Sequence, residues 1–139
     1  MTMLRSVAAI VAGFGFMAST VMVGTIIATA LFIPGGLTAA ASGVVPATLP
    51  IGYLAANLIV SMLGAVLGGW LAARIAVHAP FPHALVLAAI VAGMSVVTAV
   101  SVPQPAWYSV VIGAIGVIGV LLGGWLRASA AAAPPAAGV

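Results

Sequence analysis

The sequence predicts an all-α fold, an integral membrane bundle of four helices, from three observations. Hydrophobic residues make up 65% of the chain and the mean hydropathy is +1.44. Charged residues make up 2%, whereas about a quarter of an ordinary soluble domain is charged. Several apolar runs reach the roughly 20 residues that a helix needs to cross about 30 Å of hydrocarbon. We expect one transmembrane domain over residues 1–127 and an Ala/Pro-rich tail over residues 128–139.

The first predicted span covers residues 6–33, a run with no charge and no proline. It stops at Pro34-Gly35-Gly36, and a Pro-Gly pair marks a turn. A cleaved signal peptide is the competing interpretation, but its apolar segment is only about 7–15 residues long. The length of the run therefore favours a helix that stays in the membrane.

Three further apolar runs predict the other spans, over residues 51–73, 84–102 and 106–126. Pro50, Pro82 and Pro105 lie at or just before their starts. Proline fits there because the first N–H groups of a helix have no partner within the helix.

The three arginines predict the orientation of the bundle. Arg5 precedes the first span, whereas Arg74 and Arg127 follow the second and the fourth. In a chain that crosses four times, all three lie on one side, which the positive-inside rule assigns to the cytoplasm. We expect a multi-pass protein of the bacterial inner (plasma) membrane with both termini cytoplasmic, and with loops 34–50 and 103–105 outside.

Aromatic residues are expected at both membrane surfaces, since Trp and Tyr favour the headgroup region and Arg reaches beyond it. Two copies of a Gly-Gly-Trp-Leu phrase place Trp70 and Trp125 just before an arginine. The matching belt on the other side would be formed by Tyr53, Trp107 and Tyr108. The predicted interface anchors are Trp70, Trp125, Trp107, Tyr108, Arg5, Arg74 and Arg127.

Glycines predict how the helices pack. "GAVLGGWL" at 64–71 aligns without gaps with "GVLLGGWL" at 119–126, and both contain G-x-x-x-G. Small residues at this spacing let two membrane helices approach closely. The predicted packing positions are Gly64, Gly68, Gly69, Gly116, Gly119, Gly123 and Gly124.

A second repeated phrase, "AAIVAG", occurs at 8–13 and 88–93. Together the two phrases suggest two parallel copies of one hairpin, related by an axis along the membrane normal. Shared composition of membrane helices explains the same matches, so both interpretations stay open.

The order of these phrases resembles a family of small four-helix bacterial inner-membrane proteins with no assigned activity. The resemblance rests on "MLRSVAAIVAGF", "GGWLAARIA", "HALVLAAIVAG", "VPQPAWY" and "GGWLR". It implies the four-span topology and no chemistry. Members of that family often have an acidic residue late in the first span, where this chain reads "VGTIIATALF", so any role of such a residue is missing here.

The absence of Asp and Glu argues against enzymatic chemistry. It removes paired acids, the orienting acid of a catalytic triad and carboxylate ligands for hard cations. Three scattered arginines also give no basic patch for nucleic acid. We expect no enzyme, no metal site, no nucleic-acid partner, and no cofactor beyond a bound lipid.

His83 and His78 have three open interpretations. The simplest is that both are polar residues of an interfacial loop, and a second is a pH-sensitive loop contact, since histidine titrates near about 6.5. A pigment or haem needs only one axial histidine, and His83 would lie at a suitable depth for one.

Polar residues within the spans also leave two interpretations open. Asn57 and Ser61 share one helix face, and Ser95 and Thr98 share another. Such groups usually form hydrogen bonds between helices or back to the helix backbone. Together they could instead line a path for an uncharged solute.

The sequence therefore favours a non-enzymatic structural or accessory subunit, or a scaffold, that packs through Gly-rich faces in a larger membrane complex. Its expected partners are the lipid bilayer and other membrane protein subunits. The first alternative is a small oligomeric channel or transporter for an uncharged solute. The second is a pigment- or haem-supporting subunit.

Overall fold

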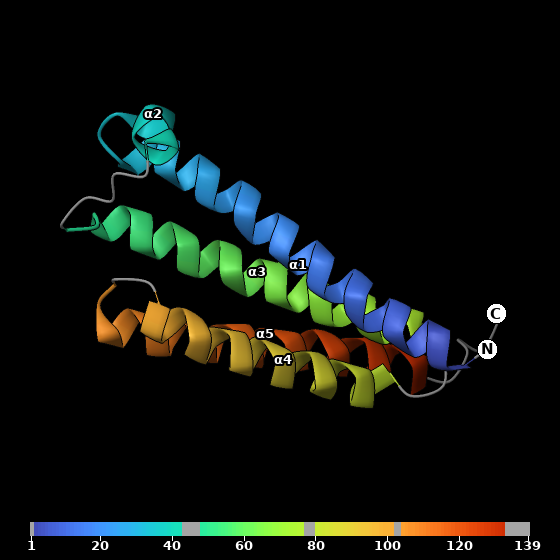
Figure 1. Cartoon of the computed structure of the whole chain (residues 1–139). Coiled ribbons are helices and arrows are strands. Elements are labelled where there is room, and N and C mark those ends of the chain that lie inside the picture. The colour runs from blue at the N-terminus through green and yellow to red at the C-terminus, as the bar shows by residue number, and fades with distance from the viewer. Residues whose placement is uncertain (1, 43–47, 77–79, 102–103, 133–139) are drawn as a thin grey trace, which may run out of the picture.

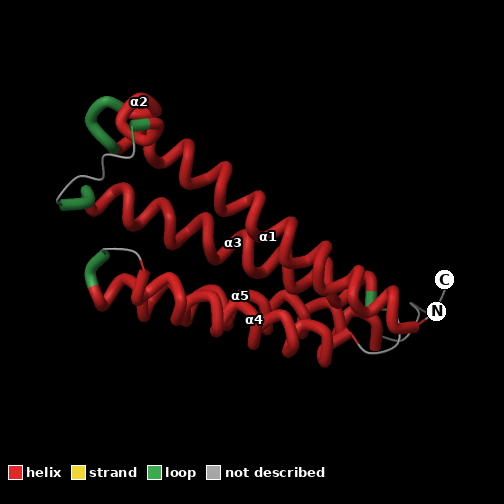
Figure 2. Tube along the Cα trace, viewed as in Figure 1, coloured by secondary structure: helices red, strands yellow, loops and turns green. Residues whose placement is uncertain are grey.

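The computed structural model describes residues 2–42, 48–76, 80–101 and 104–132, and within these ranges all regular structure is helical (Figure 2). Four helices are long and apolar enough to cross a membrane. This confirms the predicted all-α bundle and makes the chain a multi-pass membrane protein. The helices are α1 (Thr2–Phe32), α2 (Gly36–Ala41), α3 (Ile51–Ile75), α4 (Pro80–Ser101) and α5 (Ala106–Ala132).

All four spanning helices are longer than predicted, and α3 ends at Ile75 rather than at residue 73. α1 begins at Thr2, within the N-terminal residues that precede the predicted span. α4 begins at Pro80 rather than at residue 84, because a proline fits in a first turn whose N–H groups have no helical partner. α5 continues past Arg127 into the predicted tail and ends at Ala132, since alanine has the highest helix propensity.

The predicted loop 34–50 contains a short helix that the sequence reasoning missed. Gly35 and Gly36 have φ angles of +84° and +51°, a conformation that glycine adopts without steric cost. The chain turns here after α1, and α2 lies across the end of α1 (Figure 1).

α3 is the central helix of the bundle (Figure 1). It packs against α1 on one side and against α5 on the other, and α4 packs mainly along α5. In the most apolar window of each helix, 33% of the residues of α3 are buried but only 6% of those of α1. α1 therefore has a single extensive neighbour, and its remaining surface is open.

The two ends of the bundle differ in charge. Arg5 lies near the start of α1, and Arg74 and Arg127 lie near the ends of α3 and α5, which all meet at one end of the bundle (Figure 1). We call this the arginine end, and the opposite end, where α2 lies, the loop end. Toward the loop end, α1 diverges from α4 and α5 (Figure 1).

Glycines bring α1 and α3 together near the arginine end. A Cβ atom on Gly13 would lie 2.7 Å from the carbonyl oxygen of Gly68, and one on Gly68 would lie 2.8 Å from that of Gly13. Gly64 lies further along the same contact, against Val21 and Met17. The first G-x-x-x-G pair therefore faces α1.

The second G-x-x-x-G pair faces α3. A Cβ atom on Gly119 would lie 2.7 Å from the Cβ of Ala65, and one on Gly123 would overlap the carbonyl oxygen of Val66. From α3, Gly69 lies against the backbone of Val120. The two Gly-Gly-Trp-Leu phrases thus lie side by side, in helices that run in the same direction.

α4 is held to α5 by a third set of close contacts. Gly124 lies against Ala84, and a Cβ atom on Gly116 would lie 2.9 Å from Cγ1 of Val91. The buried core beside these contacts is made mostly of small side chains, with Leu87 and Val120 as the largest that are fully buried.

Equivalent positions of the repeated phrases meet different neighbours. Gly64 and Gly68 face the preceding span, whereas Gly119 and Gly123 face α3 rather than α4. Gly13 is in close contact with α3, but a Cβ atom on its counterpart Gly93 would meet nothing within 4 Å. The sequence repeat is therefore not repeated in the helix contacts.

Substituting Gly123 tests the close approach of α3 and α5. In Gly123→Ala the new methyl group meets backbone atoms of Val66 and Trp70, and overpacking of this kind costs about 1–3 kcal/mol. Gly93→Ala is the matched control, because its Cβ has open space and alanine favours a helix. We expect thermal unfolding in detergent, followed by Trp fluorescence, to show a lower Tm for Gly123→Ala only. Equal Tm values would contradict this contact.

Candidate functional site

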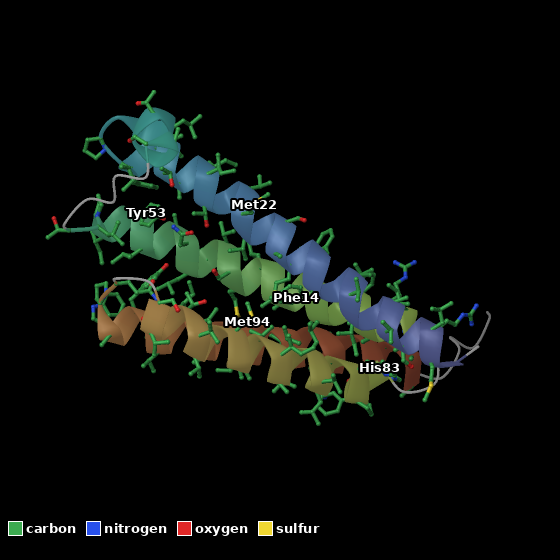
Figure 3. All side chains as sticks on the ribbon, viewed as in Figure 1. Phe14, Met22, Tyr53, His83 and Met94 are labelled. Carbon is green, nitrogen blue, oxygen red and sulfur yellow. The ribbon has the colours of Figure 1, made fainter. Side chains whose placement is uncertain are left out.

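A cavity of about 380 Å³ lies between the helices, and we call it the side cavity. Its lining comes from the middle of α1, the second half of α4, and the start of α5 with Gln104 just before it, while α3 contributes Ser61. Figure 3 shows Phe14, Met22 and Met94, which belong to this lining, near the middle of the bundle. The cavity reaches from there toward the loop end, where α1 and α4 separate.

The lining combines an apolar wall with a few neutral polar groups. Most of the lining side chains are aliphatic or methionine, with Phe14 as the aromatic member. The polar groups are those of Ser61, Ser95, Thr98, Gln104 and Ser109. A concave, mostly apolar site with a few polar groups is the usual form of a small-molecule site.

Three polar side chains of the cavity lining donate hydrogen bonds within the protein. The Ser95 hydroxyl donates to the carbonyl oxygen of Val91 at 2.8 Å, and the Thr98 hydroxyl donates to that of Met94 at 2.9 Å. The Gln104 side-chain amide donates to the Ser109 hydroxyl at 2.8 Å. Each of the three hydroxyl oxygens still has a free lone pair, and the Ser109 proton remains available for donation.

Ser61 differs from the other lining hydroxyls. It is 7% exposed and lines the cavity from the central helix. Among the described residues, no hydrogen bond of its hydroxyl group is found. No buried side-chain oxygen in the described part of the chain lacks a hydrogen-bond partner, so the Ser61 oxygen is accessible on the cavity wall and can bind a polar atom there.

Asn57 lies outside the side cavity, although it shares a helix face with Ser61. It is buried, and its Oδ1 accepts a hydrogen bond from the Thr25 hydroxyl at 2.6 Å. Its side-chain amide donates to the carbonyl oxygen of Tyr53 at 3.1 Å. Asn57 therefore joins α3 to α1 and does not continue a polar path from Ser95.

A second hollow of about 460 Å³ lies between α4 and α5 alone. Its lining is made of small and aliphatic residues, with Ser95 and Ser109 as its hydroxyl-bearing members. Because it adds no polar group to those of the side cavity, we treat the side cavity as the candidate site.

The predicted interface anchors lie at the two ends of the bundle. At the arginine end, the Arg74 guanidinium lies 5.0 Å from the centroid of the Trp70 ring, within the range of a cation–π contact. Trp125 is 55% exposed at the same end. Both indoles lie toward the arginine end of their helices.

Tyr108 differs from the expected anchor. Trp107 is 51% exposed, but Tyr108 is only 5% exposed and packs edge-on against the Trp107 ring at a centroid distance of 5.7 Å. Consecutive residues point in directions about 100° apart on a helix, so one ring faces outward and its neighbour faces the bundle.

His83 lies in the first turn of α4, at the arginine end, and is half-buried (Figure 3). His78 lies outside the described residues. His83 does not line the side cavity, which opens toward the other end of the bundle.

Sequence reasoning missed several residues of this region. Gln104 lies in a short Pro-Gln-Pro connection, and Ser109 was not among the polar positions singled out in the spans. Thr25, in contrast, is one of the hydroxyl-bearing residues of the first span, for which a hydrogen bond between helices is the usual interpretation. The cavity depends on how each helix is rotated and on where α1 and α4 separate. No sequence motif specifies either, so the cavity could not be predicted from the sequence.

No known protein family, curated protein or solved structure matches this chain.

The link between α1 and α3 can be tested with a double-mutant cycle. We expect Thr25→Val and Asn57→Leu to be non-additive, because each removes the same hydrogen bond, and such bonds in membrane proteins couple by about 0.6 kcal/mol on average. The measurement is the free energy of unfolding in mixed micelles.

The control cycle pairs Thr98→Val with Asn57→Leu. Thr98 bonds only to the backbone of its own helix among the described residues, so this pair should be additive. Additivity in the Thr25 and Asn57 cycle would show that the hydrogen bond does not link the helices.

Proposed function

We propose that the protein is a non-enzymatic structural or accessory subunit, or a scaffold, of a larger membrane complex. The observation that supports this proposal is a packing motif that the chain presents but does not use. In α1, Ala9 and Gly13 are buried, and Gly13 lies against α3. In α4, the equivalent residues Ala89 and Gly93 are exposed, and a Cβ atom on Gly93 would have open space.

An exposed small-residue face favours a partner helix because few other forces hold helices together in lipid. Lipid tails are as apolar as the helix surface, so membrane helices associate through close packing of small residues and a few hydrogen bonds. Ala89 and Gly93 form such a small-residue face on α4. Gly15 offers a second open position on α1. A helix from another protein would find on α4 the small-residue face that α3 finds on α1.

The channel or transporter for an uncharged solute ranks second. The side cavity favours it, because hydroxyl groups line part of its wall. Asn57, which would have to continue the path, is instead bonded to Thr25 and Tyr53. A haem or pigment role for His83 has no geometric support beyond its place at a helix start.

The expected orientation stands beside this proposal. We propose that the arginine end faces the cytoplasm of a bacterial inner membrane, since positive residues favour that side. A reporter fused after Val139 should therefore show cytoplasmic activity, and one inserted between Ser42 and Thr48 should show external activity. The readout is a pair of compartment-specific enzymes, such as a phosphatase and a galactosidase. Activity with the opposite sidedness would reverse the proposed topology.

The subunit proposal is tested by extraction of native membranes in mild detergent. We expect the chain to migrate on a native gel with foreign subunits in fixed stoichiometry. Gly93→Leu should abolish this co-migration, because a bulky side chain blocks the small-residue face without a clash inside the chain.

The matched control is Val110→Leu, an exposed position on α5 with no small-residue motif. It should leave the complex intact, and both variants should keep the thermal stability of the parent protein. Migration of the parent chain alone, or only with copies of itself, would refute the subunit proposal and leave the solute path as the function to test.

A further inference from the structure

We propose that the side cavity binds one uncharged, single-chain lipid whose head carries a hydroxyl group. This inference goes beyond the subunit role, because the cavity and the Ala89/Gly93 face are lined by different residues of α4.

The charge distribution supports an uncharged occupant. The chain has no acidic residue, and its three arginines lie at the arginine end, away from the cavity. A charged head group near the middle of the bundle would have no counter-charge there, and an unpaired charge in an apolar site is strongly disfavoured. Neutral hydroxyl and amide groups suit a neutral ligand.

The hydrogen-bonding capacity of the wall supports a hydroxyl head. Ser95 and Thr98 use their protons on backbone oxygens, so each can only accept a further hydrogen bond. Ser61 and Ser109 each have a proton available for donation. An alcohol both donates and accepts, whereas an ester or an alkane cannot donate.

The place of the opening supports an occupant that comes from the bilayer. α1 packs almost entirely on α3 and diverges from α4 toward the loop end (Figure 1). Ala18 and Met22 lie on the rim, and both are exposed. Because the helices cross the membrane, this gap opens sideways toward the lipid tails.

The size of the cavity supports a single chain. At about 380 Å³, it lies at the lower end of the roughly 300–1,000 Å³ found for small-molecule sites. The tail would contact Phe14, Met17 and Met94, and methionine adapts readily to a flexible chain.

The test uses the purified full-length chain in phosphatidylcholine vesicles. The probe is a long-chain alcohol that carries a photoreactive diazirine in its tail, and mass spectrometry locates the labelled residues. We expect labelling to concentrate in residues 14–22 and 94–98. Two comparison probes carry the same tail. The first is an alkane, which lacks the hydroxyl group, and the second is a quaternary ammonium, which carries a positive charge.

Two neighbouring substitutions on α1 supply the matched pair. Ala18→Trp places a large ring in the cavity mouth, whereas Ser19→Trp adds the same ring at an exposed position outside the lining. We expect at least a tenfold loss of labelling for Ala18→Trp and less than a twofold change for Ser19→Trp. Circular dichroism and the Tm establish that both variants are folded.

Ser61→Ala tests the head-group contact. Loss of one hydrogen bond should lower labelling by the alcohol roughly threefold to tenfold and leave labelling by the alkane unchanged. Equal labelling of Ala18→Trp and the parent chain, or labels spread over exposed positions such as Val110, would overturn the site. Equal labelling by all three probes, or an unaffected Ser61→Ala variant, would overturn recognition of the hydroxyl head.

Discussion

The bundle depends on the close approach of the backbone of α3 to two neighbours at once. Gly64 and Gly68 lie on the side that meets α1, and Gly69 lies on the side that meets α5. In lipid there is no gain from hiding apolar surface, so such backbone contact provides much of the association between helices. Glycine is required at Gly69 because the Val120 backbone occupies the space that a side chain would need.

This arrangement explains why α1 is only partly covered. Its contacts run along α3, from Gly13 near the arginine end to the hydrogen bond between Thr25 and Asn57. α4, in contrast, follows α5, which lies on the other side of α3. Because α1 and α4 pack against different helices, they separate toward the loop end, and the side cavity lies between them there.

The sequence was sufficient for the parts of the fold that depend on composition and length, but not for those that depend on helix rotation. Apolar length predicted the four helices, and the Pro34-Gly35-Gly36 break marked the end of α1. Which face of a helix turns inward is normally read from an apolar stripe, and helices that are apolar all round have none. For this reason the burial of Tyr108, the open space at Gly93 and the cavity were visible only in the structure.

Ser61 is the residue that packing alone leaves unexplained. The residue is only 7% exposed, but its hydroxyl oxygen is accessible, since no buried side-chain oxygen among the described residues lacks a hydrogen-bond partner. Asn57 has partners on two sides, so it strengthens the contact with α1. Ser61 gains no such bond among the described residues, while its side chain borders a space bounded by other hydroxyl groups. An accessible hydroxyl group on the wall of a mostly apolar space can bind the polar head of a ligand, which is why the cavity is better understood as a binding site than as a packing defect.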